Sequence, residues 1–293
     1  MPTFPASQPV PVVVDVPFAN LHVVAGDRDE LYEVVENLVD RDDVVVTVLP
    51  TDPAKSGSVR AAQDVRVDRD GDAVTILYPG SWKQFVLPFA AGTADITVEL
   101  PAGSDLRGKA GTLYTEGSLG DVDMTLSVAD VRLEDVERLA LKASAGSVVV
   151  GRVAGTADVQ VSAGSVRISE IAGDGTIKAS NGTTTVGAVT GTLAVQGAHG
   201  EIAVNRVVGS LTAKSAHGGI RVDRLESGSV TLSTSFGSID VGVPEGTAAF
   251  LDASSEHGSV RNHLTPTEGP VEDEATAEIH ASTGFGDVVV RRP

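Results

Sequence analysis

Residues 139–228 consist of five copies of an 18-residue repeat, with no residue between one copy and the next. The copies read LALKASAGSVVVGRVAGT, ADVQVSAGSVRISEIAGD, GTIKASNGTTTVGAVTGT, LAVQGAHGEIAVNRVVGS and LTAKSAHGGIRVDRLESG. A repeat unit this short cannot bury its apolar side chains alone, so it folds only by packing against the neighbouring copies. The repeat therefore predicts a stack of similar layers and argues against a globular fold.

A glycine and the apolar residues around it recur at fixed positions in every copy. The glycine is found at Gly146, Gly164, Gly182, Gly200 and Gly218, and again with looser spacing at Gly237, Gly258 and Gly286. Apolar residues alternate with polar ones on both sides of it, which is typical of β-strands. Glycine suits the turn between two such strands because it adopts a positive φ at little cost. Helical repeats are excluded, since these copies show no 3.6-residue period.

Strands of successive copies are expected to pair in parallel about 4.8 Å apart, which places residues eighteen apart in one column. The sequence thus predicts an all-β, single-stranded parallel β-solenoid (β-helix) of about 18-residue coils, with an irregular N-terminal β region and one short helix. We expect the repeats to fill residues 101–293. Residues 1–100 are expected to form an irregular β opening and cap of the same continuous structural unit. Strands are predicted there at residues 12–16, 44–49, 64–67, 73–78 and 95–100.

Residues 30–41 interrupt the β pattern. Leu31, Val34, Val35 and Leu38 recur at helical spacing, and acidic residues occupy the opposite face. We therefore predict a short amphipathic helix in this segment. It either caps the open edge of the solenoid or docks a partner, and an insertion into the fold is a third interpretation.

The charge and composition of the chain exclude several classes of protein. A net charge of −18 argues against nucleic acid as a partner, because binding phosphates requires a basic surface. The absence of cysteine excludes disulfides and thiolate metal sites. Pro11 and Asp15 interrupt the first apolar run, which also lacks a basic segment before it, so no signal peptide is predicted. No transmembrane segment is predicted either, and we expect a cytoplasmic protein, with cell-surface association as the alternative.

Several motifs resemble a known family. The run VELPAGSDL at Val98 is followed by coils of the form strand, S-x-G-S/D-V-x-V and a short V-x-G turn. This arrangement resembles the bacterial putative-adhesin family of β-strand-repeat proteins of unknown function, of the actinobacterial type. The segments VDVPFANLHVVAGDRD and TDPAKSGSVRAAQDVRVDRDGD are similar to the N-terminal part of that family. The resemblance implies a β-solenoid with an adhesin-like role and no catalytic residues to carry over.

Two histidines are the candidate metal ligands. His199 and His217 precede the shared glycine in consecutive copies, so stacked coils would place them about one strand spacing apart. Zinc takes three or four protein ligands, whereas this pair supplies two. Exposed turn histidines are the alternative interpretation. No cofactor is expected.

A polar column lies four positions before the shared glycine. It consists of Lys142, Gln160, Lys178, Gln196 and Lys214. Alternating amide and ammonium groups keep like charges off adjacent coils. The column is either a solvated face or a binding face for an acidic glycan or a protein.

The sequence lacks the motifs of the common enzyme classes. It contains no phosphate-binding loop, nucleophile elbow or H-E-x-x-H helix. We therefore expect a non-enzymatic scaffold or binding protein, adhesin-like, that engages a protein or a glycan through its ladder faces. One alternative is a structural protein that self-assembles into a homo-oligomer or filament. The other is a carbohydrate-active β-helix enzyme, which would need paired carboxylates on one rung.

Overall fold

The computed structural model describes residues 2–6, 8–26, 43–78, 92–128, 130–265, 269 and 274–293. The described part is built from β-strands and one helix, which confirms the all-β class. Contacts within the chain divide it into two compact units, Met1–Ser144 (unit 1) and Ala145–Pro293 (unit 2). Strand β8 (Val131–Val153) runs across this division. The boundary expected at residue 100 and the continuity of the two parts stay predictions.

Unit 2 is a series of parallel strands. They are β9 (Ala157–Ile171), β10 (Gly175–Asn181), β11 (Thr184–Val189), β12 (Thr192–His199), β13 (Ile202–His217), β14 (Ile220–Phe236), β15 (Ile239–Gly242), β16 (Thr247–Ser255), β17 (Val260–Asn262), β18 (Ala275–Phe285) and β19 (Val288–Arg291). Ile177 in β10 pairs with Val159 in β9 and with Val195 in β12. These partners are eighteen residues apart, so the predicted columns are confirmed from β9 to β13.

The apolar residues of the repeat form the interior of unit 2. Ile177 lies before the corner glycine of its coil and Val186 lies after it, and both side chains are fully buried. Each coil therefore contributes one strand to each of two faces, with its apolar side chains between them. Burying a Val, Leu or Ile side chain stabilises the fold by about 1.5–3 kcal/mol, and the repeat supplies several such side chains in every coil.

The shared glycine forms the corner between these two strands. Gly182 has a φ of 135°, which other residues rarely adopt. A Cβ atom added to Gly182 would lie 1.8 Å from the carbonyl oxygen of Gly164 on the neighbouring coil. Both the backbone conformation and the close approach of the coils therefore require glycine at this corner.

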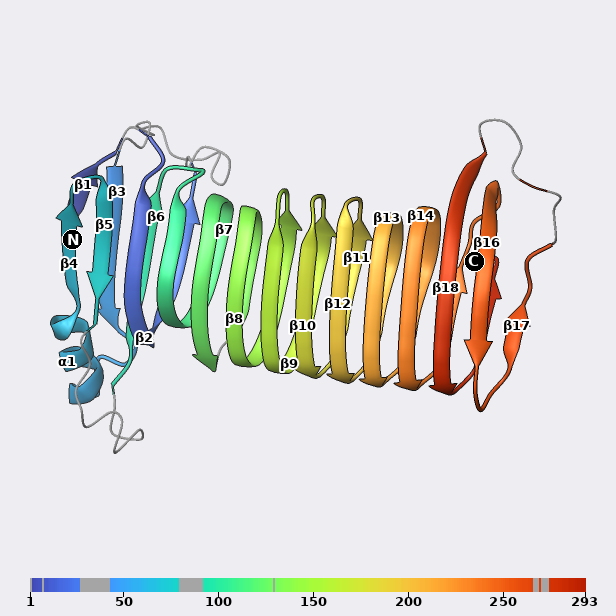
Figure 1. The fold of residues 1–293 in the computed structure, drawn as a ribbon. Coiled ribbons are helices and arrows are strands. Elements are labelled where there is room, and N and C mark those ends of the chain that lie inside the picture. Colours follow the sequence, from blue (N-terminus) through green and yellow to red (C-terminus); the bar gives the residue numbers. More distant parts are fainter. Residues whose placement is uncertain are drawn as a thin grey trace. The chain divides into compact units, whose positions relative to one another are not determined.

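The coils at the C-terminal end of unit 2 depart from chain order. Strand β18 pairs with β14 on one side and with β16 on the other. Strand β19 likewise pairs with both β15 and β17. The last coil of the chain is thus inserted between two earlier coils (Figure 1). The expectation that successive coils stack in chain order is wrong here, because a strand pairs with any open edge that matches its register.

Unit 1 combines parallel and antiparallel pairs. Its strands are β1 (Thr3–Pro5), β2 (Pro11–Ala25), β3 (Asp43–Pro50), β4 (Arg66–Asp70), β5 (Ala73–Leu77), β6 (Ala94–Leu100), β7 (Asp105–Val128) and most of β8. Strand β2 pairs in parallel with β7 on one side and with β5 and β6 on the other (Figure 1). The pairs β1–β3, β3–β6 and β4–β5 are antiparallel. Unit 1 therefore mixes two kinds of strand pairing, whereas the pairs described in unit 2 are parallel.

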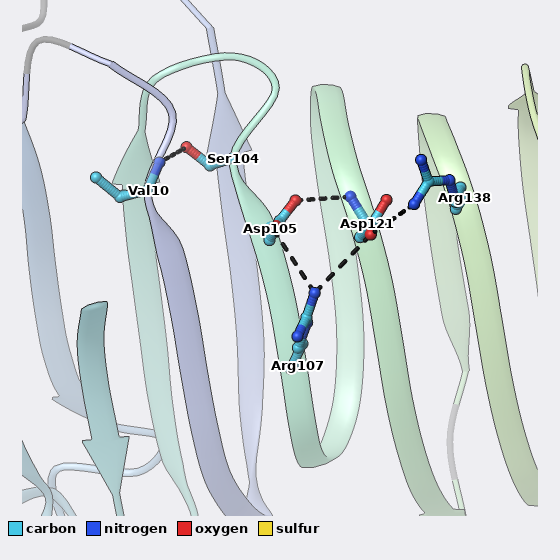
Figure 2. A network of polar contacts seen from close by, with 6 residues as sticks. All are labelled: Val10, Ser104, Asp105, Arg107, Asp121 and Arg138. Carbon is cyan, nitrogen blue, oxygen red and sulfur yellow. Dashed lines mark hydrogen bonds and ion pairs between the residues drawn. The ribbon is translucent and has the colours of Figure 1, made fainter. Parts of the chain in front are cut away.

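Polar contacts hold neighbouring coils of unit 1 together (Figure 2). The buried Ser104 hydroxyl accepts a hydrogen bond of 3.0 Å from the backbone N–H of Val10, which fixes the start of β2. Asp105 accepts a hydrogen bond of 2.9 Å from the backbone N–H of Asp121 on the next turn of the chain. The Asp121 carboxylate in turn lies 3.2 Å from the guanidinium of Arg138 and 3.8 Å from that of Arg107. The contacts with Val10 and Asp121 therefore connect segments that are distant in sequence.

The structure describes one helix that was not expected from the sequence. Helix α1 (Ser56–Asp64) buries Ser58 and Ala61, and the sequence analysis did not predict it. The strand predicted at residues 64–67 is partly wrong, since β4 begins at Arg66 after the helix has ended. The other four strands predicted in this region are confirmed within a few residues, although β2 extends well beyond residue 16. No helix among the described residues is long and apolar enough to cross a membrane.

The helix predicted at residues 30–41 lies outside the described residues, with Leu31, Val34, Val35 and Leu38. Its role as a cap, a docking element or an insertion stays a prediction.

Candidate ligand-binding face

One face of unit 2 carries most of the candidate residues. We call it the ladder face: the outer surface of the strand segments that precede the corner glycines in β9, β10, β12, β13, β14, β18 and β16. Alternate side chains on these segments point outward, and parallel pairing places outward side chains of the same register in columns. The columns are therefore a direct consequence of the repeat.

The polar column is assembled as the sequence indicated. Gln160, Lys178, Gln196 and Lys214 are register partners on consecutive strands, and Ser233 continues the column. Both lysine side chains are exposed. Since Gln196 lies between them, the two lysine positions are two strand spacings apart, about 10 Å. Lys142 is also exposed but belongs to unit 1.

A second column consists of stacked rings. The rings follow one another in the order His199, His217, Phe236, Phe285 and His257, with centroid distances of 5.0, 4.9, 4.9 and 4.5 Å. The first three pairs are within 6° of parallel, and the last pair is inclined by 25°. All five side chains are exposed. Sequence reasoning identified the two neighbouring histidines, but it did not place Phe285 next to Phe236, because that contact depends on the inserted coil.

The two candidate metal ligands lie side by side. His199 and His217 are register partners, and their rings are stacked 5.0 Å apart. Among the described residues, no group of three or more His, Asp or Glu side chains is arranged to hold a metal ion. The described residues therefore place no third protein ligand for zinc beside the pair, and its geometry is that of a stacked ring pair.

A groove lies at the C-terminal end of the ladder face, with a volume of about 840 Å³. Its walls include Ser210, Ser229, Glu278 and Phe250, which are register partners on the consecutive strands β13, β14, β18 and β16. Phe250 is 63% exposed, the largest exposed fraction among the exposed large hydrophobic side chains of the described residues. The groove thus combines hydroxyl groups, one carboxylate and one aromatic ring.

His280 orients the carboxylate of this groove. Its Nε2 lies 2.9 Å from Oε1 of Glu278, and its Nδ1 lies 3.4 Å from Oδ2 of Asp252. The hydrogen bonds with Glu278 and then with Asp252 raise the pKa of His280 above its ordinary value of 6.5. The imidazolium form donates to both carboxylates, so it holds β16 and β18 together at this point. The Phe250 ring lies 6.2 Å from the His280 ring at an angle of 58°.

Hydrogen bonds at the preceding corner position the strand that carries Phe250. The guanidinium of Arg292 donates to the carbonyl oxygens of Val243, at 3.1 Å, and of Pro244. The Thr247 hydroxyl donates to the carbonyl oxygen of Glu226 at 3.1 Å. The start of β16 is therefore tied to both the end of the chain and β14.

Sequence reasoning missed the groove residues Phe250 and Glu278, and with them Asp252 and His280, which contact Glu278 and Phe250 through the His280 ring. Residues 247–262 follow the repeat too loosely for the columns to be extended by counting. One signal was present: Leu251 and Ala253 occupy inward-type positions, which places Phe250 on the outside of its strand. Other coils carry serine at the same outward position. Packing of the core does not explain an exposed aromatic ring there, so Phe250 indicates a candidate binding site.

Comparisons with known proteins show which family the chain belongs to. Three solved structures match the chain, and each match covers all of it. Two are putative adhesins, one from Parabacteroides merdae (10% identity, TM-score 0.41) and one from Bacteroides fragilis (12% identity, TM-score 0.34), and each match covers 95% of the other chain. The third is a putative cell adhesion protein from Clostridium sporogenes (9% identity, TM-score 0.21), of which the match covers 98%. No curated protein matches. The actinobacterial type of the resemblance therefore stays a prediction. The model of the Toastrack DUF4097 family matches residues 41–291, most of the chain, and the protein belongs to this family.

Proposed function

We propose that the protein is a non-enzymatic, adhesin-like binding protein whose repeats form a single-stranded parallel β-solenoid. Its ladder face engages a glycan or a protein partner. The observation that carries the proposal is the in-register column of Gln160, Lys178, Gln196 and Lys214 on an exposed face. A rigid row of evenly spaced polar groups matches a ligand that itself repeats along its length.

The charge of the column favours an acidic ligand. The chain as a whole carries a net charge of −18, so most of its surface repels anions. Lys178 and Lys214 provide two exposed ammonium groups on one face, with neutral amides on either side of Lys178. An acidic glycan, or an acidic segment of a protein, can therefore be held at this column by charge and by hydrogen bonds from the glutamine amides.

Binding to a panel of acidic glycans, acidic peptides and neutral glycans tests the proposal. The full chain is immobilised, and the wild type is compared with the double variant Lys178→Ala/Lys214→Ala. We expect the variant to lose binding to acidic glycans, and we expect wild-type binding to weaken as salt is added. The matched control is Arg152→Ala/Arg167→Ala, which removes two positive charges from the same unit outside the column. Equal losses in both variants, or a wild type that binds no acidic ligand of either class, would rule the proposal out.

Self-association is a second candidate function, supported by an open strand edge. Within the described residues, β16 pairs only with β18, and β17 pairs only with β19. Unpaired strand edges are templates for pairing with another chain. Val260 in β17 is 44% exposed beside this edge. Sedimentation velocity over a range of concentrations should show association that Val260→Lys weakens, and a wild-type monomer at every concentration would exclude this function.

A further inference from the structure

The groove at the end of the ladder face has a volume typical of a small-molecule site. Its volume of about 840 Å³ falls within the range of roughly 300–1,000 Å³ that is usual for ligand pockets. Ser210, Ser229, Glu278 and Phe250 form one column across four adjacent strands. At one strand spacing per step the column is about 14 Å long, so it offers room for a ligand of one or two sugar rings.

The chemistry of the column changes along its length. Phe250 presents an aromatic ring to the solvent at one end. Glu278 lies beside it in register, and the two serine hydroxyls follow. An aromatic ring is an apolar platform, whereas a carboxylate and hydroxyls accept or donate hydrogen bonds. A ligand that fits this sequence of groups has an apolar C–H face and several hydroxyl groups, which describes a pyranose sugar.

The charges around the groove favour an uncharged sugar over an acidic one. His280 lies between two carboxylates, at 2.9 Å from Glu278 and 3.4 Å from Asp252. With the imidazole protonated, these three groups together carry one negative charge, which repels an anionic ligand. A carboxylate has about four acceptor positions. The hydrogen bond from His280 therefore leaves Glu278 with acceptor capacity for two neighbouring hydroxyls of a sugar.

A peptide is a poorer fit to the same groove. Extended peptides bind sheets by adding a strand to an open edge. Of the four strands that carry the column, β13, β14 and β18 are paired on both sides. Recognition at these three strands must therefore come from side chains, and those available along the column are hydroxyls, a carboxylate and one aromatic ring.

We propose that this groove binds an uncharged saccharide, with Phe250 as the stacking platform and Glu278 as the acceptor for sugar hydroxyls. His280 acts as a positioning residue that orients the Glu278 carboxylate. The inference rests on the proposed function as a binding protein, but it uses a different part of the ladder face from the lysine column.

The direct test is titration of the full chain with glucose, galactose, N-acetylglucosamine, cellobiose and chitobiose, followed by calorimetry and saturation-transfer NMR. We expect at least one of these sugars to bind. Phe250→Ala and Glu278→Gln should each weaken its binding by at least about 10-fold. The matched controls are Phe236→Ala, which removes an exposed ring of the ring column, and Glu256→Gln, which removes an exposed carboxylate. Both controls should bind like the wild type.

The positioning role has its own readout. Because His280 donates to Glu278 when protonated, wild-type affinity should fall as the pH rises above the pKa of His280. His280→Gln should bind more weakly and lose this dependence. Absence of binding by every sugar, or unchanged affinity in Phe250→Ala, overturns the inference. The lysine double variant separates the two proposals: it should lose acidic glycans and keep uncharged sugars, so either proposal can fail while the other holds.

Discussion

Replacing Gly182 with alanine should destabilise unit 2 strongly, because two separate features of the corner exclude a Cβ atom. The backbone of Gly182 has a φ of 135°. The new Cβ would lie 1.8 Å from the Gly164 carbonyl oxygen, and contacts of Cβ atoms below 3.0 Å essentially never occur. The two coils must therefore separate locally by about 1.2 Å, the difference between these distances.

The size of the effect follows from what this separation breaks. Holding alanine in a sparsely populated φ region costs about 1–3 kcal/mol. The backbone hydrogen bond from Val166 to the Thr183 carbonyl, 2.9 Å long, joins the same two coils at this corner. Losing it costs about 0.5–1.5 kcal/mol, and disturbing the tight packing costs a further 1–3 kcal/mol or so. Together these contributions predict a loss of about 2.5–7.5 kcal/mol in the free energy of unfolding.

Urea denaturation followed by circular dichroism measures the loss, and hydrogen exchange locates it. We expect faster exchange in residues 157–199 of Gly182→Ala than in the wild type. Gly246→Ala is the matched control, since Gly246 also has a positive φ, of 79°, but no atom lies within 4 Å of its added Cβ. That variant has only the backbone cost, about 1–3 kcal/mol. Similar stabilities for the two variants would refute the argument that close contact between coils requires glycine at the corner.

Two further predictions concern polar contacts. Ser104→Ala should lower the free energy of unfolding by about 1–3 kcal/mol, because it leaves a buried backbone N–H unpaired. Arg138→Ala, which breaks only an exposed ion pair, should change the free energy of unfolding by less than about 1 kcal/mol. Equal losses in Ser104→Ala and Arg138→Ala, measured by urea denaturation, would contradict this reasoning. Glu278 and Asp252 raise the pKa of His280 in the folded state. Protonated His280 therefore stabilises the fold fully below its pKa in the unfolded chain, about 6.5, and this stabilisation is lost as the pH rises through its pKa in the folded state. Unfolding measured between about pH 5 and 9 should show this decline in the wild type and not in His280→Gln, and identical curves would contradict it.

Columns of equivalent residues could be predicted from the repeat because register and burial are linked in a strand. A shift of one residue would move every apolar side chain of a coil to the outside. Ile177 and Val195 therefore have one acceptable alignment, the one that is observed. The neighbouring positions of Lys178 with Gln196 and of His199 with His217 follow from the same alignment.

Helix α1 could not be predicted from the repeat pattern. Its nine residues include few large apolar side chains, and its first turn lacks acidic residues. Such a short helix owes its stability to contacts with the rest of unit 1, of which the buried Ser58 and Ala61 are examples. Local sequence therefore held no strong signal for it.

The sequence alone determined the all-β class, the parallel 18-residue register and the set of buried side chains of the repeats. All three depend on residues that repeat at a fixed spacing. Tertiary structure decided the insertion of β2 beside β7 and of β18 between β14 and β16. An open strand edge accepts any strand of matching register, so local pattern does not specify which strand arrives. The groove depends on that choice, because only the inserted coil brings Glu278 and His280 beside Phe250 and Asp252.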